Sequence, residues 1–447
     1  MGTFTRSIRT LIALSLALAL PAAHGADLLG VYRLATRNDP QLQAAEQARL
    51  AVLQARPESR AGLLPSIGFN LNINRSHFDN KLSGGSAPGL GDYATNQSYT
   101  LQLSQPLFNR GAWERLSQAD SRIAEADVEY AAARQGLMLR VAVRYFGVLK
   151  ARADLKFVRA DLEATRRRSE QARKRFRVGL GAITDVREAQ ARYDAVAARK
   201  IVARNALDSA REALEEITDA PPGRLADIRG TLALARPVPE AMNRWVDTAL
   251  QRNLQVLART RAVDVARREV GVQRSGHYPT VALVADTQYL DENPFGNFQL
   301  RQRQSSIGIR LRLPIFQGGA VTARTRRAVH LYSEAQDRLV QARRRTVRET
   351  RDAYRDVLAN ISRVEALRQA VVSAQTALQA TEAGFKVGTR TIVDVLDFQR
   401  NLYSAQSDYA AARYDYLVST LRLKQAAGIL SADDLIEINR DLSVADD

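Results

Sequence analysis

The chain has 447 residues, of which 45% are hydrophobic, a fraction that allows a sizeable buried core. It contains no cysteine, which excludes a disulfide framework, a cysteine-ligated metal and a thiol nucleophile. The formal net charge of +17 would suit a protein that binds nucleic acid. The arginine runs, however, lie in long helical stretches that also carry Glu and Asp. We therefore interpret them as solvated helix faces and expect no nucleic-acid partner.

The first residues predict a secretory signal peptide at 1–25. Arg6 and Arg9 precede the apolar run 11–20, and a stretch of small residues follows. A positive flank, an apolar core and small residues at the cleavage site are the parts of an export signal. The run is too short to cross a bilayer as a helix, which needs about 20 residues.

The rest of the sequence contains two related halves. The segment 176–180 (FRVGL) corresponds to 385–389 (FKVGT), and 106–108 (PLF) corresponds to 314–316 (PIF), in the same order. We therefore predict an internal duplication. The expected units are the signal peptide (1–25), a first repeat (26–217) with a β-hairpin at 66–107, a linker (218–239), a second repeat (240–430) with a β-hairpin at 280–315, and a C-terminal tail (431–447).

Long helices are expected after each hairpin. Proline is absent from 107–220 and from 315–447, and both stretches are rich in good helix formers. One helix from Gly111 to Phe176 would reach about 100 Å. A heptad pattern with small residues in one column follows each Val-Gly turn, which is typical of coiled-coil packing. An isolated coiled coil is the alternative for these helices.

The segments between the helices alternate with a period of two. Ile67, Phe69, Leu71 and Ile73 are separated by polar or small residues, and 99–103 and 307–313 repeat the pattern, with 280–289 less regular. This alternation predicts strands with one apolar face. Runs of about 10 residues suffice for a tilted strand to cross a bilayer.

Four such strands cannot seal themselves in lipid. Unpaired strand edges are excluded from hydrocarbon, and single-chain barrels begin at about eight strands. The strands predict oligomerisation: two copies would supply eight strands, three twelve and four sixteen. A soluble β-sandwich is the alternative, but the chain offers no second sheet to cover the apolar faces.

The segment 387–397 (VGTRTIVDVLD) closely resembles the second helical turn of the TolC family of outer-membrane efflux and type I secretion channel proteins. The segment 178–186 (VGLGAITDV) resembles the first, and the resemblance extends over about 27–430. It implies an α+β membrane protein that forms a homotrimer. A 12-stranded transmembrane β-barrel in the outer-membrane lipid would stand on a long α-helical coiled-coil barrel that extends into the periplasm. The linker (218–239) and the C-terminal tail (431–447) would be equatorial, around the middle of the helical barrel.

The resemblance also implies the partners and the function. The helical tips would meet a periplasmic adaptor (membrane fusion) protein, itself bound to an inner-membrane pump or ABC-type transporter. Such ducts passively conduct drugs, small toxic molecules or unfolded proteins, with no cofactor and no enzyme activity of their own.

Family gate positions carry over onto matching residues of this sequence. Asp185 and Arg390 would form polar links that keep the entrance shut. Asp394 and Asp397 would line its narrowest part as carboxylate rings, which attract cations. Phe385 replaces the Tyr found here in the family's best-known member, so that hydroxyl cannot form a hydrogen bond. The candidates for adaptor docking are Gly179, Leu180, Gly388 and Thr389.

These residues also have simpler interpretations. Gly179 and Gly388 suit the positive φ found where helices end. Asp185 with Glu188, and Asp394 with Asp397, resemble helix N-caps with an acidic partner three residues on.

Three other functions fit the sequence less well. A cytosolic or nucleic-acid-bound coiled coil would not need the export signal or the amphipathic strands. A periplasmic adaptor would need lipoyl-like β modules around a single helical hairpin. An enzyme is disfavoured because no nucleophile–base arrangement, metal cluster or phosphate loop is recognisable.

Overall fold

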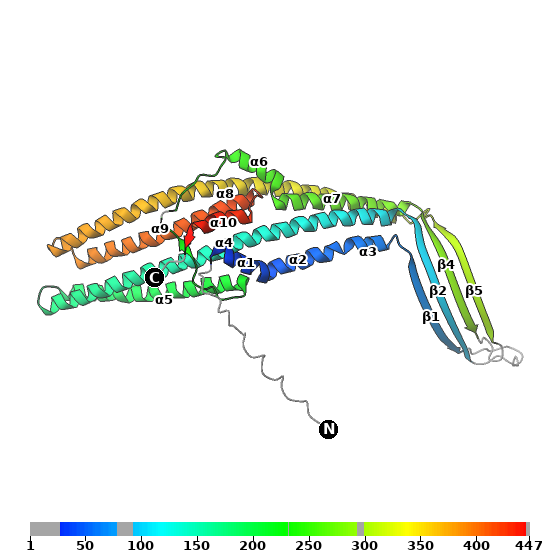
Figure 1. The fold of residues 1–447 in the computed structure, drawn as a ribbon, viewed down its shortest axis with the longest axis horizontal. Coiled ribbons are helices and arrows are strands. Elements are labelled where there is room, and N and C mark those ends of the chain that lie inside the picture. The colour runs from blue at the N-terminus through cyan, green and yellow to red at the C-terminus, as the bar shows by residue number, and fades with distance from the viewer. Residues whose placement is uncertain (1–26, 78–92, 231, 293–298, 444–447) are drawn as a thin grey trace, which may run out of the picture.

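The computed structural model describes residues 27–77, 93–230, 232–292 and 299–443. The predicted signal peptide lies outside these residues, as do residues 78–92 and 293–298 of the two hairpins. The molecule is elongated, with a four-stranded sheet at one end and long helices that run to the other (Figure 1). The expected α+β class is confirmed.

Both halves contain helices, a hairpin and a long helical pair in the same order. The first half forms α1 (Leu28–Asn38), α2 (Pro40–Leu53), α3 (Ala55–Ala61), β1 (Ser66–His77), β2 (Tyr93–Asn109), α4 (Arg110–Arg177) and α5 (Ile183–Thr218). The second half forms α6 (Met242–Arg252), α7 (Leu254–Arg274), a 3-10 turn (Ser275–His277), β4 (Thr280–Glu292), β5 (Leu300–Arg312), α8 (Ala320–Lys386) and α9 (Ile392–Ala426). The short strands β3 (Asp227–Ile228) and β6 (Leu442–Ser443) and the helix α10 (Ala432–Arg440) complete the described chain.

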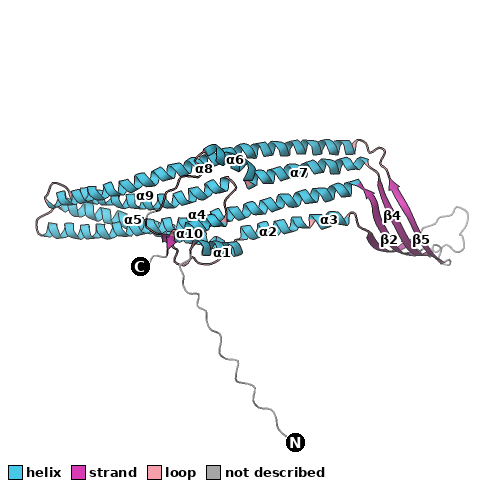
Figure 2. Cartoon of the chain, turned by 45° about the horizontal axis from the view of Figure 1, so that its top comes forward, coloured by secondary structure: helices cyan, strands magenta, loops and turns pink. Residues whose placement is uncertain are grey.

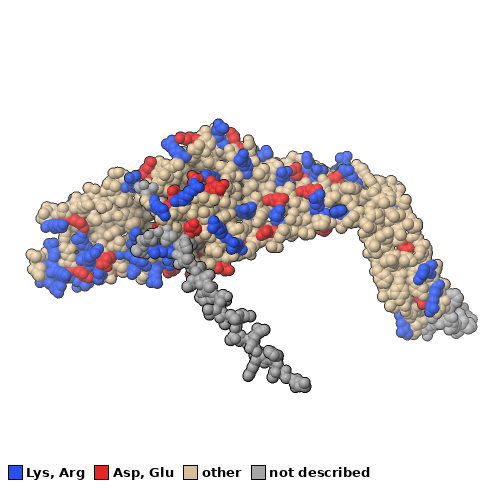
Figure 3. Space-filling model, viewed as in Figure 1, with Lys and Arg blue, Asp and Glu red and all other residues tan. Residues whose placement is uncertain are grey.

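The long helices reach the predicted length. α4 has 68 residues and α8 has 67, so each is about 100 Å long. No helix in the described ranges is both long and apolar enough to cross a membrane. Figure 3 shows Lys and Arg mixed with Asp and Glu along the helical body, as expected for solvated faces.

The sheet is antiparallel throughout, in the order β1-β2-β4-β5. One row of paired residues runs from Ile67 through Leu103 and Ala285 to Ile307. The β2–β4 pairing joins the two halves, and its register shifts between Pro106 and Phe108. A bulge fits this position because proline has no N–H to donate to the ladder. Within the described chain, β1 and β5 are edge strands with one side unpaired.

The helices next to the sheet lie side by side in the same order as the strands to which they are joined. α3 leads into β1, β2 leads into α4, α7 leads into β4, and β5 leads to α8. α2 and α3 pack on α4, α4 packs on α7, and α7 packs on α8, as Figure 2 shows. Farther from the sheet, α5 packs on α4, and α9 packs on α4 and α8. The chain is therefore one wall, four elements wide along its length.

In the middle of this wall, buried tyrosines of α4 and α9 join the long helices to the linker. Tyr145 is fully buried and its hydroxyl donates to Ala226 O at 2.7 Å. The Tyr414 hydroxyl donates to Asp227 Oδ1 at 2.7 Å, and Arg152 Nη2 lies 2.9 Å from Asp227 Oδ2. The segment around Asp227 also forms β3, which pairs with β6 of the C-terminal tail. Linker and tail thus form a belt that lies across α4 and α9.

This aromatic cluster predicts a loss of stability in alkali. Burial raises the pKa of Tyr145 and of Tyr414, and nearby carboxylates add to both shifts. The native state then keeps phenol protons that the unfolded chain loses above about pH 10. The free energy of unfolding should be fully retained below about pH 10 and fall as the pH rises further.

Urea unfolding of the detergent-solubilised protein at about pH 8 and about pH 11 measures this fall. The double variant Tyr145→Phe, Tyr414→Phe should be less stable at both pH values, by about 1–3 kcal/mol for each lost hydrogen bond. Its stability should depend less on pH. An equally steep alkaline loss in the variant would contradict the assignment.

Candidate gate at the helix tips

The turns that join each long helical pair lie at the end of the molecule opposite the sheet (Figure 1). In the first turn Gly179 has φ +74°, in the left-handed region that favours glycine. Leu180 N donates to Arg175 O at 2.9 Å, which closes the helix end as in a Schellman motif. The interpretation of Gly179 as a helix-ending residue is therefore confirmed.

The second turn repeats this geometry. Gly388 has φ +83°, and Thr389 N donates to Gly384 O at 2.9 Å. Gly384 also makes room for Arg390, because a Cβ at this glycine would lie 2.8 Å from the Cγ of Arg390. The equivalent turns in the two halves thus end their helices in the same way.

The acidic residues begin the returning helices, but not as N-caps. Thr391 is the N-cap of α9: its Oγ1 accepts from Asp394 N at 3.2 Å, and Asp394 Oδ2 accepts from Thr391 N at 2.9 Å. In α5 the N-cap is Ala182, whose N–H donates to Asp185 Oδ2 at 3.4 Å. The expectation that Asp185 and Asp394 are N-caps is wrong. Both carboxylates reach back from the third helical position instead.

The charge of Asp394 is secured by its neighbours. The Thr391 backbone N–H holds the pKa of Asp394 below its usual value, and the Thr391 hydroxyl and the charge of Arg390 lower it further. Asp397 lies one turn on and pairs with Arg400 at 3.3 Å. Arg390 is exposed and makes no hydrogen bond or ion pair with the described residues of its own chain. A link from Arg390 to Asp185 would therefore run between two chains.

Contacts that the sequence did not predict join the two helical pairs near the tips. The Arg175 guanidinium lies 5.0 Å from the ring centroid of Phe385, and Arg168 forms an ion pair with Glu382. Phe385 of α8 also borders a small apolar cluster drawn from α4, α5 and α9. Its buried members are Ala172, Ala189, Ile392 and Leu396.

A buried carboxylate lies farther from the tips. Asp161 of α4 is 3% exposed, and its Oδ1 accepts from Gln399 Nε2 of α9 at 3.2 Å. Arg192 Nη2 of α5 lies 3.7 Å from Asp161 Oδ2. Three helices are therefore held in register by one charge. No motif in the sequence indicates this contact, because Asp161 and Gln399 lie 238 residues apart.

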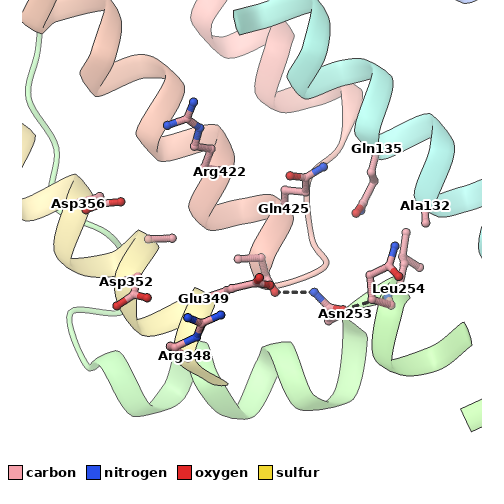
Figure 4. Close-up of a pocket in the computed structure, with 13 residues that line it drawn as sticks. Ala132, Gln135, Asn253, Leu254, Arg348, Glu349, Asp352, Asp356, Arg422 and Gln425 are labelled. Atoms are coloured by element: carbon pink, nitrogen blue, oxygen red, sulfur yellow. Dashed lines mark hydrogen bonds between the residues drawn. The ribbon is translucent and has the colours of Figure 1, made fainter. Parts of the chain in front are cut away.

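A pocket of about 480 Å³ lies where α4, α7, α8 and α9 meet (Figure 4). Asn253 caps α7 through its Oδ1, and its Nδ2 donates to Ala426 O at 2.9 Å. Positively and negatively charged side chains line the pocket, among them Glu349 and Arg422. No group of three potential metal ligands occurs in the part of the chain that the structure describes.

Residues 31–219 and 245–429 match the sequence profile of the family described as outer membrane efflux protein. The chain belongs to this family. It is 40% identical to the outer membrane protein TolC of Vibrio cholerae over 424 residues, which cover 94% of each protein. It is 33% identical to the alkaline protease secretion protein AprF of Pseudomonas aeruginosa over 441 residues, which cover 97% of this chain and 91% of that one.

Solved structures share the fold. The crystal structure of the CmeC outer membrane channel of Campylobacter jejuni aligns with a TM-score of 0.78 over 93% of this chain and 90% of that one, at 16% identity. As an outer membrane efflux protein, this chain resides in the outer membrane and is a transport duct, not an enzyme.

The turn geometry predicts opposite effects for two glycine substitutions. Gly388→Ala should destabilise the tip by about 1–2 kcal/mol, because an L side chain is strained at positive φ. Gly136→Ala, in the interior of α4, should stabilise its helix by about 0.5–1 kcal/mol, since an added Cβ meets only Arg140 Nη1 at 3.6 Å.

Amide hydrogen exchange of the detergent-solubilised protein measures both effects. Exchange should accelerate in the last turn of α8 in Gly388→Ala and should not accelerate in α4 in Gly136→Ala. Unchanged exchange at the tip of Gly388→Ala would count against the strained turn.

Proposed function

We propose that three copies of this chain pool their sheets into a 12-stranded outer-membrane barrel whose helices continue as a tunnel across the periplasm. The assembly would be the exit duct of a tripartite efflux pump or a type I secretion system. An internal duplication would underlie the wall, and the two family matches in one chain support it.

The observation that carries this proposal is the pair of open edges. β1 and β5 each leave one side without a strand partner, and their exposed face carries Ile67 (72% exposed) and Ile307 (76% exposed). Lipid can cover the apolar face but cannot satisfy the backbone groups of the edges. Pairing β5 of one copy with β1 of the next satisfies both requirements.

The helical edges support the same assembly. Below the sheet the outermost helices are α5 and α8. Ile201 and Val202 of α5 are 71% and 68% exposed, and Val372 of α8 is 54% exposed. Apolar side chains on both outer helices would be buried if α5 of one copy packed on α8 of the next.

The apolar face of the sheet also has the slant of a barrel. On β1 the exposed apolar side chains run from Ile67 to Ile73, but Ile73 lies in the same row as Arg301. On β5 they run the other way, from Ile307 to Leu311. The band is thus displaced by about 17 Å along the strands over about 14 Å across them, a tilt of about 50°. Barrel strands are tilted by about 35–45°.

The tips would form the entrance and its docking surface. Asp185 and Arg390 would link neighbouring copies, Phe385 would pack beneath them, and Asp394 and Asp397 would form carboxylate rings. The turns expose apolar residues that no described part of the chain covers: Val178 (68%), Leu180 (69%) and Val387 (76%). Together with Gly179, Gly388 and Thr389 they would receive the hairpin of a periplasmic adaptor, which connects to an inner-membrane pump or ABC-type transporter.

The relatives support two classes of cargo. AprF is named for the secretion of alkaline protease, and CzcC of Cupriavidus metallidurans, 28% identical over 328 residues, for resistance to cobalt, zinc and cadmium. Deleting the gene would separate these classes, through a missing secreted protein or through sensitivity to small toxic compounds.

The proposed duct predicts the state of the purified protein. It should require detergent, have the mass of three chains by light scattering, and conduct ions in planar bilayers. A sample unfolded in denaturant is the one-chain control. A particle of one chain, or a protein soluble without detergent, would overturn the duct.

The carboxylate rings predict a change of selectivity. The double variant Asp394→Asn, Asp397→Asn should lose most of its preference for cations in planar bilayers, because it removes six charges from a trimer and keeps side-chain acceptors for the Thr391 cap. Asp415→Asn, in the middle of α9, is the control and should conduct as the wild type does. Unaltered selectivity in the double variant would refute the rings.

A further inference from the structure

Three arginines break the apolar character of the exposed sheet face. Strand residues two apart share a face, so Arg75 lies on the same face as Ile73, and Arg301 and Arg303 lie on the same face as Ile307. All three are near the loop ends of their strands. We call Arg75, Arg301 and Arg303 the outer arginine cluster. Figure 3 shows blue side chains on the sheet near the loops.

Most of the charge of this cluster is uncompensated. Arg301 Nε lies 3.2 Å from Asp291 Oδ2, but its side chain is still 62% exposed. The Arg75 guanidinium lies 4.8 Å from the ring centroid of Tyr93 and has no carboxylate partner among the described residues. Arg303 makes no hydrogen bond or ion pair with any described residue. Each copy therefore presents about two unpaired positive charges.

The three arginines lie at the part of the sheet that would be close to the membrane surface in the proposed barrel. An arginine that faces lipid is costly at the middle of a bilayer and tolerated near its surface. On β1, Arg75 lies two residues beyond Ile73, on the loop side of the apolar side chains. On β5, Arg303 lies four residues before Ile307, also on the loop side of the apolar side chains. The paired rings of Tyr99 and Tyr289, 6.0 Å apart, lie on the same face. Tyrosine is enriched at this level of membrane proteins.

Assembly would bring the arginines together. In the proposed barrel, on which this inference rests, β5 of one copy pairs with β1 of the next. The slant of the apolar band places Arg75 and Arg303 at similar heights, since each follows the band on its own strand. Each of the three junctions between copies would then hold one complete cluster.

We propose that the outer arginine cluster binds the phosphate groups of an anionic glycolipid in the outer leaflet. Guanidinium groups bind phosphate oxygens in a bidentate manner and are weakly hydrated, which suits a partly apolar surface. The flanking tyrosines and isoleucines would contact the sugar and the upper acyl chains. The lipid would bridge two copies and so stabilise the junction at the outer surface.

The test compares two variants of the full chain purified in detergent. The first is Arg75→Gln, Arg301→Gln, Arg303→Gln. The matched control is Arg310→Gln, Arg312→Gln, which removes arginines from the opposite face of β5. Binding of lipopolysaccharide is measured by native mass spectrometry. Affinity should fall at least about tenfold in the triple variant, since each lost ionic contact weakens binding severalfold. The control should bind as the wild type does.

The outcomes separate the two proposals. Equal binding by a three-chain wild type and a three-chain triple variant overturns the cluster and leaves the duct intact, whereas a one-chain particle overturns the duct itself. Displacement of the lipid by millimolar inorganic phosphate would show a free-anion site and also overturn the lipid assignment. Wild-type conductance of the triple variant in bilayers free of lipopolysaccharide, with weakened lipid binding, establishes that the loss is local and supports the cluster.

Discussion

Backbone hydrogen bonding at the edges of the sheet constrains everything else in this protein. Water can satisfy an open strand edge, whereas lipid cannot, and each unpaired group in hydrocarbon costs several kcal/mol. The chain places apolar residues such as Ile67 and Ile307 on the exposed face and leaves β1 and β5 open. Because each strand continues into a helix of the same wall, a pairing between copies that closed the sheet would also set which helices become neighbours.

The two ends of the wall differ in the kind of side chain that they expose. At the sheet, the exposed side chains would face lipid in the proposed barrel, from the isoleucine band to the outer arginine cluster. At the tips, the chemistry is polar and local: Thr391 and Asp394 bond to each other, and Arg175 covers Phe385. The capping bond and a role in a carboxylate ring are compatible for Asp394, because the bond to Thr391 also keeps that carboxylate ionised.

Much of the fold could be predicted because its signals are local. Period-two alternation located the strands, and the absence of proline after residue 106 predicted a helix that the structure extends over Arg110–Arg177. Tertiary contacts between distant segments could not be predicted this way: the bond from Gln399 to Asp161 spans 238 residues. The sequence suggested Asp185 as the N-cap of α5, three residues after the actual N-cap, Ala182. Ala182 could not be recognised because it has no side-chain acceptor. The barrel, the trimer and the gate roles stay predictions.

The belt at Tyr145 and Tyr414 gives the long helices a mechanical property. From Tyr145 to the tip at Phe176, α4 extends about 47 Å with no break. A stiff rod held at one point converts a small rotation there into a large displacement at its free end. Turning α4 by only about 6° at the belt would move the tip sideways by about 5 Å. In the proposed duct, the diameter of the far opening would thus depend on packing at the belt as well as on the residues that line it.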